Sequence, residues 1–159
     1  MPIHIVTSSN ESLAIADKHK SLSLMTKLDE FNIAHVFCSP DIFCLQSILP
    51  FCWKNGIYTR IEYSLHDFVH EICKPSEDAR MALCMLNGYK SFTKVEELES
   101  EDNECRKERV TYFYEYVKQM FSPTSTVLLF THKNCSDIIM ETNTHYSKTK
   151  IDDFTIISL

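Results

Sequence analysis

One group of residues whose types and spacing could support chemistry lies between His66 and Arg80. His66 and His70 stand four positions apart, so on a helix they would share one face, with Asp67 and Cys73 close by. Imidazole, thiolate and carboxylate are the ligands that zinc prefers, but no flanking ligand pair completes a site here. We therefore expect two surface histidines and no bound metal. A metal-dependent enzyme built on Asp67, His66 and His70 is the least favoured function.

Cysteine chemistry fits the sequence no better. A cysteine phosphatase loop places five residues between its Cys and its Arg, whereas six separate Cys73 from Arg80. The chain has seven cysteines, an odd number, and no Cys-x-x-Cys pair, which is typical of free thiols in a reducing compartment. Polar residues from His4 to Glu11 also interrupt any signal peptide. We therefore expect an intracellular protein, cytoplasmic or nuclear.

Composition excludes several other classes. The 159 residues are 44% hydrophobic and carry a net charge of −6, so a broad nucleic-acid surface is not expected. No stretch approaches the roughly 20 apolar residues of a membrane-spanning helix. The only two glycines, Gly56 and Gly88, lie in ordinary turn contexts, so the sequence has no glycine-rich phosphate loop. We expect no cofactor, no direct nucleic-acid partner and no membrane partner.

Short apolar runs alternate with helical patterns along the whole chain. The expected strands are Pro2–Thr7, His35–Cys38, Ile57–Tyr63, Thr126–Phe130 and Phe154–Leu159. Three expected helices span residues 13–31, 76–88 and 105–121. Another follows Ser39, which would cap it, with Pro40 as its first residue. A short fifth helix contains Ile138 and Ile139. This alternation predicts one α/β domain over residues 1–159, with a mostly parallel central sheet.

The stretch from Cys38 to Ser47 also carries a family resemblance. In order, it has Cys-Ser-Pro, two variable residues, Phe43, two more variable residues and Gln-Ser. This order and spacing resemble a motif of the histidine phosphatase (phosphoglycerate mutase-like) superfamily, in which Ser-Ser-Pro is followed by Arg and then by Gln-Thr. The run Thr126–His132 is similar to the late strand of that family, which ends in Ser-His-Gly. The resemblance implies a phosphoglycerate mutase-like three-layer sandwich with helices on both faces of the sheet.

The resemblance also implies that the catalytic set is degenerate. Enzymes of this family transfer phosphate through a phosphohistidine, with cationic side chains that hold the phosphoryl oxygens. The position of the nucleophilic histidine falls on Ser8, and that of the adjacent arginine falls on Thr7. The second arginine is replaced by Phe43, and only the second histidine is kept, as His132.

A proton donor is the remaining part of the family mechanism. Asp67, and less closely Glu71, lies near the position of the family's carboxylic acid. A donor alone cannot replace the histidine nucleophile and two arginines, so the resemblance implies a pseudophosphatase and not an enzyme.

A binding function is the expectation that remains. The leading hypothesis is a scaffold or protein-interaction module of a multi-subunit complex. Its candidate surfaces are an aromatic edge with Tyr112, Tyr116 and Phe113, and the acidic run from Glu96 and Glu97 to Glu104. A homodimer is plausible from the resemblance alone.

The alternative is non-catalytic binding of a phosphorylated ligand. It would use a relic pocket at a helix N-terminus, formed by Ser8, Ser9, His132 and Lys133. For His132 itself we prefer an inherited, hydrogen-bonded histidine in a pocket that Phe43 partly fills.

Overall fold

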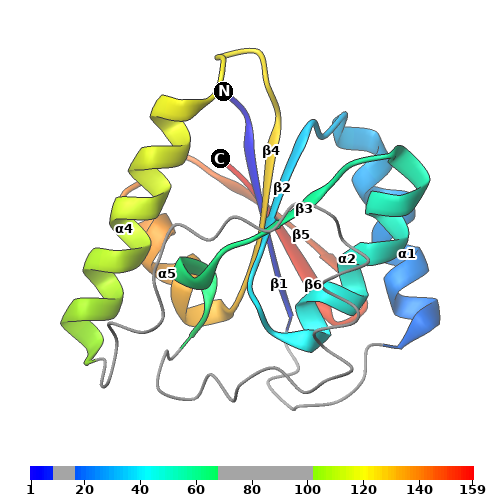
Figure 1. Cartoon of the computed structure of the whole chain (residues 1–159), viewed down its shortest axis with the longest axis horizontal. Coiled ribbons are helices and arrows are strands. Elements are labelled where there is room, and N and C mark those ends of the chain that lie inside the picture. The colour runs from blue at the N-terminus through cyan, green and yellow to red at the C-terminus, as the bar shows by residue number, and fades with distance from the viewer. Residues whose placement is uncertain (9–16, 68–101) are drawn as a thin grey trace.

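Six strands form one sheet in the computed structural model, which describes residues 1–8, 17–67 and 102–159 (Figure 1). The strand order is β3-β2-β4-β1-β6-β5. The first four strands in this order run parallel, and β6 runs antiparallel to both β1 and β5. The strands are β1 (Ile3–Ser8), β2 (His35–Cys38), β3 (Thr59–Ile61), β4 (Val127–Thr131), β5 (Ser147–Ile151) and β6 (Phe154–Ser158).

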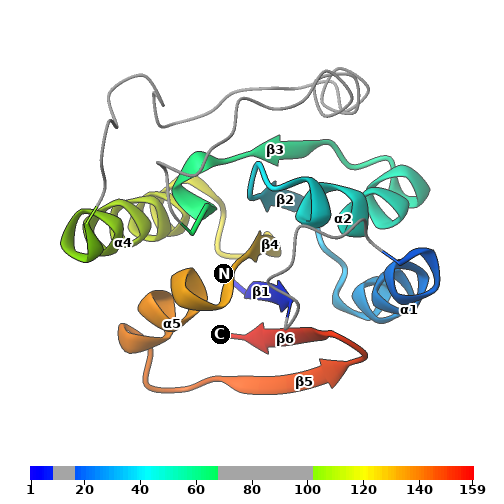
Figure 2. The same ribbon diagram turned by 90° about the horizontal axis from the view of Figure 1, so that it is seen from below.

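Helices cover both faces of the sheet, as Figure 2 shows in a view along its edge. One face is covered by α1 (Lys18–Leu28) and α2 (Ile42–Asn55), and the other by α4 (Asn103–Met120) and α5 (Lys133–Glu141). Two short 3-10 turns, η1 (Asp29–Phe31) and η2 (Tyr63–Leu65), follow α1 and β3. No helix in the described part of the chain is long and apolar enough to cross a membrane. The α/β class, the three layers and the mostly parallel sheet are confirmed.

Alternating side chains of the strands form two hydrophobic cores. Leu128 and Phe130 of β4 point to the face under α1 and α2, while Leu129 points to the face under α4 and α5. All five residues of β4 are buried, which suits a parallel strand in the middle of a sheet. The apolar run in the sequence therefore predicted this strand almost to the residue.

Two predicted helix starts are wrong. Asp41, not Ser39, is the N-cap of α2, because its carboxylate accepts hydrogen bonds from the N–H groups of Phe43 (2.8 Å) and Cys44 (3.4 Å). The first helix was expected from residue 13, but α1 begins at Lys18 after its N-cap Asp17. Asp17 accepts two backbone hydrogen bonds there and so fixes the start of the helix.

The strand expectations also need two corrections. Only Thr59–Ile61 of the expected strand Ile57–Tyr63 pairs with the sheet, and the strand ends at Glu62, whose carboxylate accepts a hydrogen bond from the Ser64 N–H (2.8 Å) and caps the 3-10 turn. Strand β5 was not expected at all, and it pairs with β6 across a turn in which Asp152 has a φ of 50°. The expected helix 76–88 lies outside the described residues.

Phe130 provides a test of the core under α1 and α2. Its side chain is fully buried and meets the ring of Phe154 edge-on, with 6.0 Å between the centroids. We expect Phe130→Ala to lower the free energy of unfolding by about 3–5 kcal/mol, measured by chemical denaturation. Tyr58→Ala is the control, because Tyr58 is 68% exposed and its loss should change stability by less than about 0.5 kcal/mol. Equal losses in the two variants would contradict this description of the core.

Candidate functional site

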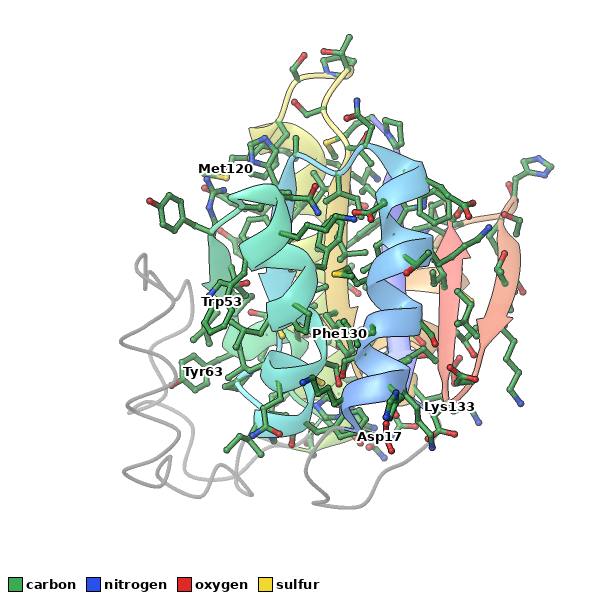
Figure 3. The ribbon with its side chains drawn as sticks, turned by 90° about the vertical axis from the view of Figure 1, so that its right-hand side faces the viewer. Asp17, Trp53, Tyr63, Met120, Phe130 and Lys133 are labelled. Carbon is green, nitrogen blue, oxygen red and sulfur yellow. The ribbon has the colours of Figure 1, made fainter. Side chains whose placement is uncertain are left out.

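Three neighbouring parallel strands, β3, β2 and β4, have their carboxyl ends on the same side of the molecule, and we call this side the carboxyl edge of the sheet. Two helices also begin at this edge, since Asp41 is the N-cap of α2 and His132 occupies the N-cap position of α5. Figure 3 shows Lys133, the first residue of α5, at the same end of the molecule as Asp17, the N-cap of α1. Lys133 therefore lies at a helix N-terminus, where the sequence placed it. Open α/β sheets bind their ligands at such an edge.

Two histidines and an aspartate converge there. The rings of His66 and His132 meet edge-on with 5.4 Å between their centroids. Asp41, His66 and His132 each offer one possible metal-ligating atom, and these three atoms lie within 4.8 Å of one another. The Ser39 hydroxyl lies 3.0 Å from Nε2 of His132 and also accepts a hydrogen bond from the Asp41 N–H at 3.3 Å. We call Asp41, His66 and His132 together the Asp41–His66–His132 cluster.

The backbone that carries His66 is held from two sides. The Arg109 guanidinium donates to the carbonyl oxygens of Tyr63 (2.9 Å) and His66 (3.0 Å). Cys135 donates to the same His66 oxygen at 3.3 Å. The Thr131 hydroxyl donates to the carbonyl of Leu65 at 2.6 Å. Side chains of α4, α5 and β4 therefore fix the position of His66.

Asp67, the candidate proton donor, is committed to other contacts. It forms an ion pair with Arg106 at 2.8 Å, and the Arg106 side chain is only 11% exposed. Both carboxylate oxygens also accept hydrogen bonds from Nδ2 of Asn134, at 3.1 and 2.9 Å. These contacts tie the loop after η2 to α4 and α5. Glu71, the other candidate, lies outside the described residues, as do His70 and Cys73 of the expected metal set.

Phe43 occupies the position at which the family carries its second arginine. It is 9% exposed and belongs to the core under α1 and α2. Its ring packs against that of Phe154, with 6.0 Å between the centroids. Thr7, at the position of the first arginine, is 6% exposed. Phe43 therefore contributes apolar packing and no charge to this end of the sheet.

A groove of about 550 Å³ lies between α5 and the β6–β5 hairpin. Three lysines and one carboxylate are among the side chains that line it, so its charge favours an anion. Its polar lining is Thr7, Ser8, Lys133, Ser136, Asp137, Lys148, Lys150 and Thr155. We call it the basic groove.

The structure divides the predicted phosphate-binding set. Ser8 and Lys133 both line the basic groove, whereas His132 belongs to the Asp41–His66–His132 cluster. Ser9 lies outside the described residues. The predicted pocket therefore corresponds to two neighbouring features at the ends of β1 and β4.

The described cysteines are poorly suited to nucleophilic chemistry. Burial raises the pKa of the Cys38 and Cys44 thiols well above their usual value. Burial also raises the pKa of Cys52 to about 11 and that of Cys135 to about 12. The hydrogen bond with Asp102 raises the pKa of the exposed Cys105. All five stay protonated near neutral pH.

The candidate interaction residues have different environments. Tyr112 is 74% exposed, Tyr116 is partly buried, and Phe113 is 2% exposed in the core. The prediction that Phe113 contributes to an exposed edge is therefore wrong. Tyr112 lies beside a shallow groove of about 470 Å³ along α4, lined by Glu104, Lys107, Glu108, Thr111 and Tyr112. Glu96 and Glu97 lie outside the described residues.

Sequence reasoning missed several residues of this region. Arg106 and Arg109 are three positions apart on α4, a spacing that places them on one side of a helix. Lys148 and Lys150 alternate with Ser147 and Thr149, which is a strand pattern without an apolar face. These signals were present in the sequence, but nothing in it identified their partners.

Comparison with known proteins supports the fold. No known protein family and no curated protein sequence matches the chain. Among solved structures, the chain is similar to the ecdysone phosphate phosphatase of Bombyx mori in complex with tungstate, with a TM-score of 0.56 and 12% sequence identity. The match covers 94% of this chain and 81% of that one. The chain therefore has the phosphoglycerate mutase-like α/β fold that its resemblance implied, and such low identity establishes the fold alone.

Arg109 provides a test of how the site is held together. Lysine cannot donate to two separate carbonyls in the same planar geometry, so we expect Arg109→Lys to lower the free energy of unfolding by about 1.5–3 kcal/mol. The NMR signals of the His66 ring should shift in the same variant. Lys107→Arg, an exposed change on the same helix, is the control and should leave both quantities unchanged. Unshifted His66 signals in Arg109→Lys would show that Arg109 does not position this residue.

Proposed function

We propose that the protein is a catalytically inactive member of the histidine phosphatase fold that works as a binding module for a protein partner. The observation that carries the proposal is the placement of Phe43 in the core, where the family has a phosphate-binding arginine. Ser8 stands at the position of the nucleophile, and a hydroxyl cannot form a phosphohistidine. In enzymes that stabilise a transition-state charge, removal of one hydrogen-bond donor costs about 2.7–4 kcal/mol. The combined loss favours a function without turnover.

The surface of α4 around Tyr112 is our candidate for the partner site. An exposed tyrosine provides a large amphipathic contact area, and such residues are enriched at the energetic centres of protein interfaces. The groove beside Tyr112 carries Glu104, Lys107 and Glu108, which could form a polar rim. Glu104 is also the last residue of the acidic run that the sequence suggested as an interaction segment. Glu104 of the acidic run and Tyr112 therefore line the same groove on α4.

Capture of a partner from native cells tests this proposal. We expect the tagged protein to recover a stoichiometric partner, identified by mass spectrometry, and Tyr112→Ala to lose most of it. Tyr58→Ala is the matched control, because Tyr58 is a similarly exposed tyrosine that precedes β3 and should not affect recovery. Recovery of the protein alone, or equal recovery by the two variants, would reject the α4 surface as the partner site.

Binding of a phosphorylated ligand is a second candidate, favoured by the basic groove. Lys133, Lys148 and Lys150 supply three positive charges around a concave surface, opposed by the single carboxylate of Asp137. Ser8 adds a hydroxyl at the carboxyl end of β1. Ammonium and hydroxyl groups are suitable donors to phosphate oxygens.

A thermal-shift titration with p-nitrophenyl phosphate tests the second candidate. At ten times its dissociation constant the compound should stabilise the protein by about 1.4 kcal/mol, and no p-nitrophenol should form above the buffer rate. Lys148→Gln combined with Lys150→Gln should abolish the stabilisation, whereas Lys118→Gln on α4 should retain it. A flat titration would reject phosphate binding in the groove. A rate of p-nitrophenol release that rises in proportion to the concentration of purified wild-type protein would reject the proposal that the protein is catalytically inactive.

A further inference from the structure

We propose that Asp41, His66 and His132 form a binding site for a divalent transition metal ion, with zinc as the best match. Each ligand follows a different strand, and these strands are neighbours in the sheet: His132 follows β4, Asp41 follows β2, and His66 follows β3 and its 3-10 turn. Parallel pairing brings all three to one edge, although they are far apart in the sequence. One possible ligand atom from each lies within 4.8 Å of the other two. This inference is independent of the proposed partner binding.

The ligand types point to zinc. Two imidazole nitrogens and one carboxylate oxygen form a set that zinc accepts, with bonds of about 2.0–2.2 Å. Tetrahedral bonds of that length place the ligand atoms about 3.3 Å apart, so the three side chains would close by about 1.5 Å at most. Three protein ligands leave a fourth position for water or an anionic ligand. Calcium and magnesium prefer sites made of oxygen atoms and match this set poorly.

Neighbouring contacts already fix the direction of the ligands. Arg109 and Cys135 hold the carbonyl of His66. The Ser39 hydroxyl lies 3.0 Å from His132, as an outer-shell partner of a metal-bound imidazole would. One oxygen of Asp41 caps α2 with two hydrogen bonds, and a carboxylate has further lone pairs to offer an ion. The cluster is therefore ordered before any ion arrives.

Electrostatics works both for and against an ion here. The charge of Asp41 attracts a cation, whereas the N-termini of α2 and α5 place partial positive charge at the same edge. Lys133, the residue after His132, carries a full positive charge. These charges weaken the binding of a bare ion and favour a negatively charged fourth ligand. We therefore expect hydroxide, phosphate or a carboxylate to strengthen the site.

Titration of the untagged, chelator-treated protein with zinc alone tests the site. We expect one zinc per chain in competition with a chromophoric chelator, and cobalt should give the visible absorption of a four-coordinate site. His132→Ala should weaken binding at least about 100-fold. Asp41→Asn should weaken it as well while retaining the α2 cap, because asparagine caps helices as well as aspartate does. Circular dichroism of Asp41→Asn distinguishes loss of a ligand from loss of the fold.

A matched control and two outcomes complete the test. His145→Ala removes an exposed histidine outside the cluster and should leave zinc affinity and the cobalt spectrum unchanged. Absence of zinc binding by the wild-type protein would overturn the site, leaving a hydrogen-bonded cluster without an ion. Binding that persists unchanged in both His132→Ala and Asp41→Asn would overturn it too, because the ion would then be held elsewhere in the chain.

Discussion

The burial of β4 on all sides is the constraint on which the rest of the structure depends. Its five residues are buried, it pairs with β1 on one edge and β2 on the other, and helices cover both of its faces. A strand enclosed in this way can offer a polar side chain to a ligand only where it ends. His132 is the first residue after that end. The same pairing brings the ends of β2 and β1 alongside, so the core determines where any chemistry can occur.

Phe43 contributes to the core at the point where the resemblance places a phosphate-binding arginine of the family. In the family an arginine at this position would face a phosphoryl group, whereas here a phenyl ring extends the core toward Phe154 and Phe130. The exchange gains buried apolar area and removes a cation that would otherwise need a partner. The fold retains its helix caps and its sheet. At that point the phenyl ring offers apolar contact and no positive charge.

The sequence predicted those parts of the structure whose signal is local. The apolar run of β4 and the heptad-like face of α4 needed no tertiary information. The start of α2 was ambiguous, because Ser39 and Asp41 are both good caps and the sequence does not choose between them. Strand β5 has no buried face, so periodicity could not reveal it. The cluster of His66 with Asp41 was also out of reach, since their proximity arises only when separate strands pair.

Strand β5 has a consequence for self-association. Among the described residues it is the last strand of the sheet, and an outer strand presents backbone groups on which a second chain could build. Its Lys148 and Lys150 are exposed, so two copies paired along this strand would bring like charges together. The repulsion guards the molecule against growth into a continuous intermolecular sheet, and with it against fibrillar aggregation. A homodimer of this protein is therefore not expected to form by extension of its sheet at β5.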